Sequence, residues 1–314
     1  MRNPVEPSLA TLPNPVLRYF AATRPAFLSV TLAGCLLGFA AAASDGVGLD
    51  AAAAMLTLLA ALAAHAGANV LNDYFDAKNG TDNDNTDRVF PFTGGSRFIQ
   101  NGVMSARTTG IFGHALLLSV IPAGLWLTAH SGSGLMLIGL CGLLVGWAYS
   151  APPLKLASRG LGEWAVAAGW LLIVIGSDFV QRHAFAFTPV AAGLGFALLI
   201  ASLLYVNQFP DVRADARAGK HTLVVRLGVE NARWGYLLLA GIAYSWTALG
   251  LASGWLPAPA ALAFLPALLS AAAARQLWTH AATPQRLAPA IRLTIVSTLA
   301  HGLLMTLALA LSSR

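Results

Sequence analysis

The stretch AAAAMLTLLAALAAHAGANVLNDYFD, residues 51–76, decides the fold, because a long apolar run ends there in a cluster of polar side chains. A second apolar run ends in the same way at Asn207-Gln-Phe-Pro-Asp211-Val-Arg213-Ala-Asp215. We call residues 69–87 the first acidic cluster and residues 207–220 the second. Of the 13 carboxylate side chains in the chain, 7 lie in these clusters: Asp73, Asp76, Asp82, Asp84, Asp87, Asp211 and Asp215. Acid concentrated in a chain that otherwise avoids it predicts a site for hard cations and, through them, an anionic ligand.

The composition is that of a multi-pass membrane protein. Hydrophobic residues make up 57% of the chain and charged residues 10%, whereas a soluble domain has about 25% charged residues. No sustained alternation with period two occurs, so we expect an all-α fold around a central cavity and not a barrel. No linker interrupts the chain, so residues 1–314 are expected to form a single domain. About nine runs are long enough to cross ~30 Å of hydrocarbon, near 25–43, 50–73, 108–128, 133–150, 162–180, 187–208, 234–254, 257–274 and 289–311.

Basic residues predict the orientation in the membrane. All of the 19 Lys and Arg except Arg182 and Arg314 fall in the N-terminal segment, in alternate loops, or at the run ends beside them. The positive-inside rule therefore places the N-terminus and both acidic clusters at the cytoplasmic face. We expect the membrane to be a bacterial inner membrane. The net charge of +6 follows from this bias, and because the charges are spread over membrane loops, nucleic-acid binding is not expected.

Each acidic cluster presents polar groups on one helix face, since positions three, four and seven apart lie on the same side. Such positions hold Asn69, Asn72, Asp73 and Asp76 in the first cluster, and Asn207, Asp211 and Asp215 in the second. Carboxylates that face each other repel unless a cation lies between them, and Mg²⁺ commonly bridges one or two carboxylates to substrate phosphates. The phosphates would also meet basic residues of the same loops: Lys78, Arg88, Arg97, Lys155, Arg159, Arg213, Arg217 and Lys220.

Two plainer interpretations of the clusters do not explain them. Asp and Asn often cap helix ends, which explains either cluster alone but not two matched clusters at equivalent places. The run from Asp82 to Asp87 resembles a calcium loop, but Asp87 stands at the place of the turn glycine and no Glu closes the loop. Calcium storage is therefore rejected.

Three motifs resemble those of the UbiA superfamily of intramembrane prenyltransferases. They are Asn72-Asp73-Tyr-Phe-Asp76, Tyr149-Ser-Ala-Pro-Pro-Leu-Lys155, and Asp211-x-x-x-Asp215 followed by Gly219-Lys220. The number of apolar runs and the order and spacing of the motifs agree over essentially the whole chain. Within the superfamily, the stretches around Gly80–Arg88 and Gly219–Gly228 look most like 1,4-dihydroxy-2-naphthoate polyprenyltransferases of menaquinone synthesis. The stretch from Tyr149 to Lys155 also looks like chlorophyll synthases.

The chain departs from the superfamily's pattern at two positions. The first motif often has a third Asp four residues after its second, but position 80 is Gly, which leaves Asp82, Asp84 or Asp87 as the substitute. Naphthoate enzymes often carry Arg before the first Asp of the later motif, where this chain has Pro210.

The resemblance implies Mg²⁺-dependent transfer of a polyprenyl group from its diphosphate to an aromatic acceptor. The implied Mg²⁺ ligands are Asn72, Asp76, Asp82, Asp211 and Asp215. From their positions in the sequence, the residues expected to bind the substrates are His65, Asn69, Arg88, Arg97, Arg213 and Lys220. The implied catalytic residues are Asp73, Tyr149 and Lys155, with Tyr149 facing an allylic cation and Lys155 the departing charge. Two of them have structural alternatives, since Tyr149 also suits an interfacial aromatic belt and His65 an interhelical hydrogen bond.

Three alternative functions remain open at this point. Another phenolic acid can be the acceptor. A terpene cyclase on the same scaffold would ionise the diphosphate and quench the cation internally. A cation-coupled secondary transporter would also use intramembrane acids, but its site is expected at mid-depth and not at one face.

Overall fold

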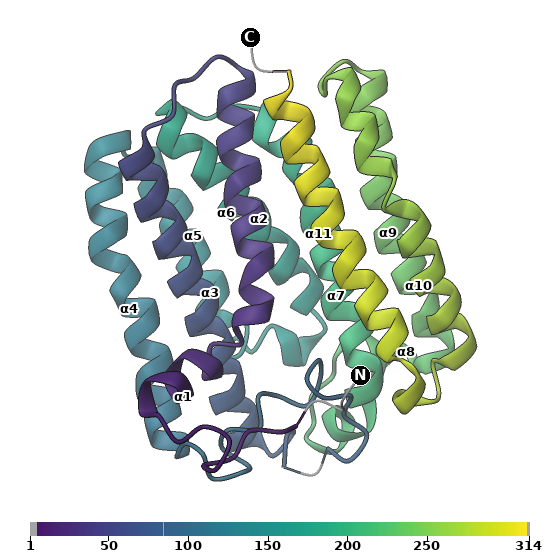
Figure 1. Ribbon diagram of the computed structural model, residues 1–314. Coiled ribbons are helices and arrows are strands. Elements are labelled where there is room, and N and C mark those ends of the chain that lie inside the picture. The colour runs from purple at the N-terminus through teal and green to yellow at the C-terminus, as the bar shows by residue number, and fades with distance from the viewer. Residues whose placement is uncertain (1–4, 84, 313–314) are drawn as a thin grey trace.

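The computed structural model describes residues 5–83 and 85–312, and within them the regular elements are helices (Figure 1). They are α1 (Pro15–Ala22), α2 (Pro25–Ser44), α3 (Ala51–Asn79), α4 (Ala106–Ser131), α5 (Gly134–Ala148), η1 (Ala157–Arg159), α6 (Gly162–Arg182), α7 (Thr188–Arg217), α8 (Leu223–Leu227), α9 (Val229–Ala252), η2 (Ala258–Phe264), α10 (Ala267–His280), η3 (Pro284–Arg286) and α11 (Ala288–Ala310). Asp84 of the first acidic cluster and Arg314 lie outside the described residues.

The expected all-α bundle is confirmed, with one short member. In the described part of the chain, eight helical stretches are long and apolar enough to cross a membrane, when η2 and α10 are counted as one stretch. The run expected at 133–150 forms only the 15 residues of α5, about 22 Å of helix, which is less than the ~30 Å of a hydrocarbon core. The helix ends at Ala148 because Pro152 and Pro153 follow and cannot continue a helical hydrogen-bond pattern. The protein is a multi-pass membrane protein.

Helices α3 and α7 extend beyond their predicted ends and carry the acidic clusters on their last turns. α3 continues to Asn79 and stops at Gly80, whose φ of 85° is a left-handed conformation that favours glycine. α7 continues to Arg217 in spite of Pro210. The polar residues from Asn69 to Asp76 and from Asn207 to Asp215 are therefore held by regular helix, whereas Asp82, Asp87 and Lys220 lie in the segments that follow the two helices.

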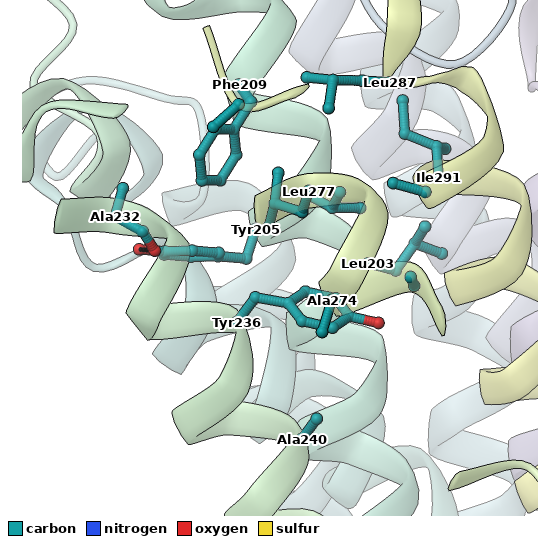
Figure 2. Packing of buried hydrophobic residues seen from close by; sticks show 14 of the residues in the cluster. Leu203, Tyr205, Phe209, Ala232, Tyr236, Ala240, Ala274, Leu277, Leu287 and Ile291 are labelled. Carbon is teal, nitrogen blue, oxygen red and sulfur yellow. Dashed lines mark hydrogen bonds between the residues drawn. The ribbon is translucent and has the colours of Figure 1, made fainter. Parts of the chain in front are cut away.

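The helices that follow the second acidic cluster pack around α7 in a dense apolar core (Figure 2). Tyr205 and Tyr236 are fully buried there, and each hydroxyl has a partner, at 2.7 Å from the Ala232 carbonyl and 2.9 Å from Thr294 Oγ1. Nearby, α11 approaches α7 closely because Gly302 has no side chain. A Cβ at that position would lie 2.6 Å from the Phe196 ring. This packing fixes α7, and with it the second acidic cluster.

Both acidic clusters lie at the same end of the bundle, which we call the polar end. Figure 1 shows the ends of α3 and α7, the loop 80–105 and α8 gathered at the lower end, with the N-terminal segment, while the C-terminus lies at the opposite end. Helix α1 lies at the polar end and exposes Val16, Leu17 and Phe20, as expected for a helix in a membrane interface.

Candidate functional site

The end of α3 directs one face of polar groups inward. Asn72 Nδ2 lies 3.0 Å from Asp76 Oδ2 and 3.2 Å from Ser150 Oγ, so this turn of α3 is linked to the segment after α5. Asp73 pairs with Arg24, and its Oδ1 also accepts from the backbone N–H of Ser96 at 3.1 Å. The helical spacing seen in the sequence therefore holds these polar groups close together on the last turns of α3.

The end of α7 contributes the second set of carboxylates. Asp211 Oδ1 accepts from Asn85 Nδ2 at 2.6 Å, and its Oδ2 accepts from the backbone N–H of Gly94 at 3.2 Å. Asn85 and Gly94 belong to the loop 80–105 that follows α3, so the loop of the first cluster binds the helix of the second.

Lys220 joins the two helix ends directly. Its Nζ lies 2.9 Å from Asp76 Oδ2 on α3 and 3.6 Å from Asp215 Oδ1 on α7. The side chains of all three residues are largely buried. The two acidic clusters, 144 residues apart at Asp76 and Lys220, thus form one site.

A cavity of about 540 Å³ opens from this site into the bundle. Its polar end is lined by both clusters, and most of the remaining wall is apolar side chain from α3, α4, α5 and α6. Three glycines of α5, Gly139, Gly142 and Gly146, line the wall, and a Cβ at any of them would meet open space. The cavity therefore has a charged end, lined by the two acidic clusters, which we call its mouth, and a long apolar body between the helices.

Of the residues predicted to bind Mg²⁺, bind substrate or act in catalysis, nine line this cavity: His65, Asn69, Asn72, Asp76, Asp82, Tyr149, Asp211, Asp215 and Lys220. The other five lie elsewhere: Asp73, Arg88, Arg97, Lys155 and Arg213. Asp73 is buried behind the wall and pairs with Arg24, which itself lines the cavity, while Lys155 is exposed. Arg213 has 65% of its side chain exposed and pairs with Asp87, so it faces away from the cavity. Arg88 and Arg97 are bound to Glu6 and to backbone carbonyl groups of their own loop.

Several residues that line the cavity were not predicted from the sequence. Arg24 lines the mouth because it caps α2 in a left-handed conformation, with φ of 56°, just before Pro25. Gly94 and Gly95 bring the loop backbone to the mouth, with φ of 76° and 74°. The adjacent glycines in the sequence could have indicated a left-handed backbone conformation here. The position of Arg24, in contrast, depends on a long-range contact with Asp73.

The balance of charge at the mouth is uneven. Burial and the neighbouring carboxylates of Asp76 and Asp73 raise the pKa of Asp82 well above its usual range. Burial alone would lower the pKa of Lys220, but the charges of Asp215 and Asp76 outweigh it and raise that pKa. Burial likewise raises the pKa of the Tyr149 hydroxyl, which stays protonated. Lys220 therefore keeps its proton and its positive charge, whereas the Asp82 carboxyl group ionises only at a pH well above its usual range.

The matching family model covers residues 30–310 and is described as the UbiA prenyltransferase family. The chain belongs to this family. It is 31% identical over 250 residues to the 1,4-dihydroxy-2-naphthoate octaprenyltransferase of Mycobacterium tuberculosis, across 74% of this chain and 81% of that protein. The chain is therefore a prenyltransferase, and the transporter interpretation is set aside.

Solved structures of UbiA homologs share the fold. The apo structure of a homolog from Aeropyrum pernix K1 superposes with a TM-score of 0.65 at 18% identity, over 88% of this chain and 97% of that one. A homolog from Archaeoglobus fulgidus, bound to DMAPP and Mg²⁺, gives 0.57 at 16% identity, over 92% and 98%. The fold of this family can therefore hold a prenyl diphosphate together with Mg²⁺ in at least one member.

The residues at the mouth fit a magnesium ion. Carboxylate and amide oxygens are the ligands that Mg²⁺ takes, and Asn207 presents a buried amide oxygen with no hydrogen-bond partner on the cavity wall. Within residues 5–83 and 85–312, no three His, Cys, Asp or Glu side chains already form a ligand cluster. Lys220 and Arg24 lie against the carboxylates there. The donor set therefore suits ions that arrive with an anionic substrate, which brings ligands of its own.

Proposed function

We propose that this UbiA-family prenyltransferase transfers a polyprenyl group from its diphosphate to 1,4-dihydroxy-2-naphthoate, with Mg²⁺ as cofactor. The observation that carries the proposal is the junction of α3 and α7 through Asp76, Lys220 and Asp215, at the mouth of a cavity that is otherwise apolar. Such a cavity matches a molecule with a strongly anionic head and a long hydrocarbon tail. The naphthoate acceptor is supported by the name of the Mycobacterium tuberculosis relative.

The diphosphate would bind at the polar end. Asn72, Asp76, Asp82, Asp211 and Asp215 would hold Mg²⁺, which neutralises charge on the departing diphosphate. Lys220 and Arg24 also line the mouth, and as cations fixed by buried carboxylates they would stabilise the same charge without reorganising.

The prenyl end would lie where the wall excludes water. An allylic cation forms as the carbon–oxygen bond breaks, and it survives to meet the acceptor only in a dry site. Tyr149 lies on the wall between mouth and apolar body, and its ring offers a surface to which a cation is attracted. The open space beside Gly139, Gly142 and Gly146 would receive the tail.

The aromatic acceptor would lie against His65. The Nδ1 of His65 is 2.8 Å from Thr31 Oγ1, and its ring meets the Trp170 ring edge-on at 4.8 Å between centroids. These contacts fix the imidazole plane on the cavity wall. The Trp170 Nε1 is buried there with no hydrogen-bond partner among the described residues, so it can donate to an acceptor oxygen. His65 Nε2 would then accept the hydroxyl proton of the acceptor.

We place the polar end in the cytoplasm and the protein in the inner membrane of a bacterium. The basic loops of the chain support this orientation, since they lie at the polar end with both acidic clusters. The substrates would therefore enter from the cytoplasmic side.

The test is a transfer assay on the purified chain in lipid nanodiscs. Labelled prenyl diphosphate is supplied with Mg²⁺ and either 1,4-dihydroxy-2-naphthoate, 4-hydroxybenzoate or no acceptor. We expect a prenylated naphthoate product that disappears when Mg²⁺ is chelated. Preference for 4-hydroxybenzoate would overturn the acceptor assignment, and a cyclised hydrocarbon formed without acceptor would overturn the transfer reaction.

A further inference from the structure

The N-terminal segment, residues 5–14, lies against the loop 80–105 that closes the polar end of the cavity. Figure 1 shows both at the same end of the bundle. Asn101 Nδ2 donates to the Pro7 carbonyl at 3.0 Å and to Glu6 Oε2 at 3.1 Å, which ties the two segments together. Neither acidic cluster includes this segment, and the family model begins only at residue 30.

Glu6 lies between the two arginines of that loop. Its Oε1 accepts from Arg88 Nε at 2.8 Å and lies 2.6 Å from Arg88 Nη2, while its Oε2 lies 3.8 Å from Arg97 Nε. That Nε is buried and makes no hydrogen bond in the described part of the chain, so its pairing with Glu6 is electrostatic. The Arg97 side chain is only 9% exposed, which leaves water little access to its charge.

The same arginines hold the backbone at the mouth of the cavity. Arg97 donates through Nη1 to the carbonyl of Asp82, whose carboxyl group lines the cavity. Arg88 donates through Nη1 to the carbonyl of Asn85 at 2.6 Å, and Asn85 in turn binds Asp211 on α7. One carboxylate in the N-terminal segment is thus connected, through two arginines, to both sides of the diphosphate site.

The two arginines need this carboxylate because their positive charges repel each other. Burial and the charge of Arg88 lower the pKa of Arg97. Partial burial alone would raise the pKa of Glu6, but hydrogen bonds from Asn101 and Arg88 and both arginine charges outweigh it and lower that pKa. Glu6 is therefore ionised at neutral pH, and its charge offsets the repulsion between Arg88 and Arg97.

We propose that Glu6 is a positioning residue for the prenyl diphosphate site, because it holds Arg88 and Arg97 in the places from which they fix the backbone at Asp82 and Asn85. The inference rests on the proposed function for its ligand. It assigns Arg88 and Arg97 a role that acts through the loop and not through direct contact with phosphate.

The test uses the full chain in nanodiscs and compares wild type with Glu6→Gln, Glu6→Asp and Glu230→Gln. Gln is isosteric with Glu but neutral, and its NH₂ group would face the donors of Asn101 or Arg97. Glu230 also pairs with an arginine, Arg233 at 3.2 Å, and its exposed side chain lies far along the chain on α9, so Glu230→Gln is the matched control. Two quantities are measured: KM and kcat with prenyl diphosphate varied, and amide hydrogen exchange of peptides from 80–105.

We expect Glu6→Gln to raise KM about fivefold with kcat within about twofold of wild type. A loosened site would lose the same binding energy for the substrate and for the transition state, which changes KM but not kcat. Exchange in 80–105 should become faster in the same variant. Glu6→Asp should stay closer to wild type because it keeps the charge, and Glu230→Gln should match wild type in both quantities.

Three results would overturn the proposal. One is unchanged KM and exchange in Glu6→Gln. A second is a lower KM, which would mean that Glu6 competes with the diphosphate for the arginines. The third is a fall in kcat at constant KM, as loss of folded protein would give. The exchange measurement needs no turnover, so failure of the wild type to transfer prenyl groups would reject the proposed function without affecting this test.

Discussion

The acidic ends of α3 and α7 are matched in sequence but differ in how the structure neutralises them. On α3, Asp73 pairs with Arg24 and Asp76 with Lys220 at 2.9 Å. On α7, Asp211 accepts hydrogen bonds from the neutral Asn85 amide and the Gly94 N–H, and Asp215 is 3.6 Å from the shared Lys220. The carboxylates at the end of α7 are therefore less fully neutralised by neighbouring cations than those at the end of α3. We propose that α3 supplies a pre-formed half of the site, while the α7 half would be completed by cations that come with the substrate.

The largest effect should come from removing one carboxylate on either side of Lys220. Asp76→Asn or Asp215→Asn should lower kcat/KM by at least about 10³-fold, because each removes a proposed metal ligand and leaves Lys220 partly unpaired. Initial rates in nanodiscs, with size-exclusion profiles to confirm folding, provide the measurement. Asp45→Asn, at the opposite end of the bundle, is the control with wild-type activity. Normal turnover in either mutant of the site would refute the shared-site account.

Removing the shared cation should have the next largest effect. Lys220→Met keeps the aliphatic chain but leaves Asp76 and Asp215 facing each other, so we expect kcat/KM to fall about 10²-fold. The Mg²⁺ concentration for half-maximal activity should fall at the same time, because Asp76 and Asp215 lose their shared cation and would bind Mg²⁺ more tightly. A rise in that concentration would show that Lys220 supports metal binding.

The contrast between the two ends predicts unequal responses of Asp211 and Asp73. Asp211→Asn should raise the Mg²⁺ concentration for half-maximal activity about tenfold, whereas Asp73→Asn should raise it only about twofold because Asp73 already pairs with Arg24. A magnesium titration of both variants at fixed prenyl diphosphate measures the difference. Equal shifts of this Mg²⁺ concentration in the two variants would contradict the proposed difference between the ends of α3 and α7.

The raised pKa of Asp82 predicts how stability depends on pH. An acid whose pKa is raised in the folded state binds more protons when folded, so the free energy of unfolding falls as pH rises from its ordinary pKa of 3.8 through the raised value. Without Mg²⁺, the apparent Tm should therefore decrease with rising pH over this window. Asp82→Asn should flatten the slope, and added Mg²⁺ should oppose it by pairing with the ionised group. A wild-type Tm that rises across the window would contradict the assignment.

The smallest effect is expected for the exposed cations of the second cluster and the α5 turn. Arg213→Ala and Lys155→Ala should change kcat/KM by less than about twofold, because neither side chain lines the cavity and exposed ion pairs contribute little. The same kinetic assay measures both. A loss of tenfold or more in either would mean that the closed, substrate-bound site recruits it.

Much of the fold was predictable because apolar length determines which segments can cross a membrane. Hydropathy placed the long helices, but it could not show that α3 and α7 continue past the apolar region, since polar helical turns carry no hydropathy signal. The short α5 was visible only in its prolines, Pro152 and Pro153, which follow an apolar run of apparently sufficient length.

The site was predictable where helical periodicity applies and unpredictable where tertiary contacts decide. Spacing grouped Asp211 with Asp215, and the same spacing places Arg213 about 200° around the helix from Asp211, on the opposite face. The exposure of Arg213 was therefore readable from the sequence. The contacts of Arg24 with Asp73 and of Glu6 with Arg88 join segments far apart in the chain, and no local pattern indicates them.

The most direct test of the central claim, that both helix ends form one metal–diphosphate site, is the binding of Mn²⁺ measured by electron paramagnetic resonance. Mn²⁺ serves as a paramagnetic substitute for Mg²⁺, and wild type, Asp76→Ala and Asp215→Ala are each titrated with prenyl diphosphate present. We expect Mn²⁺ binding in the wild type to depend on the diphosphate, and either substitution to abolish this binding. Unchanged Mn²⁺ binding in either variant would show that α3 and α7 do not share the site.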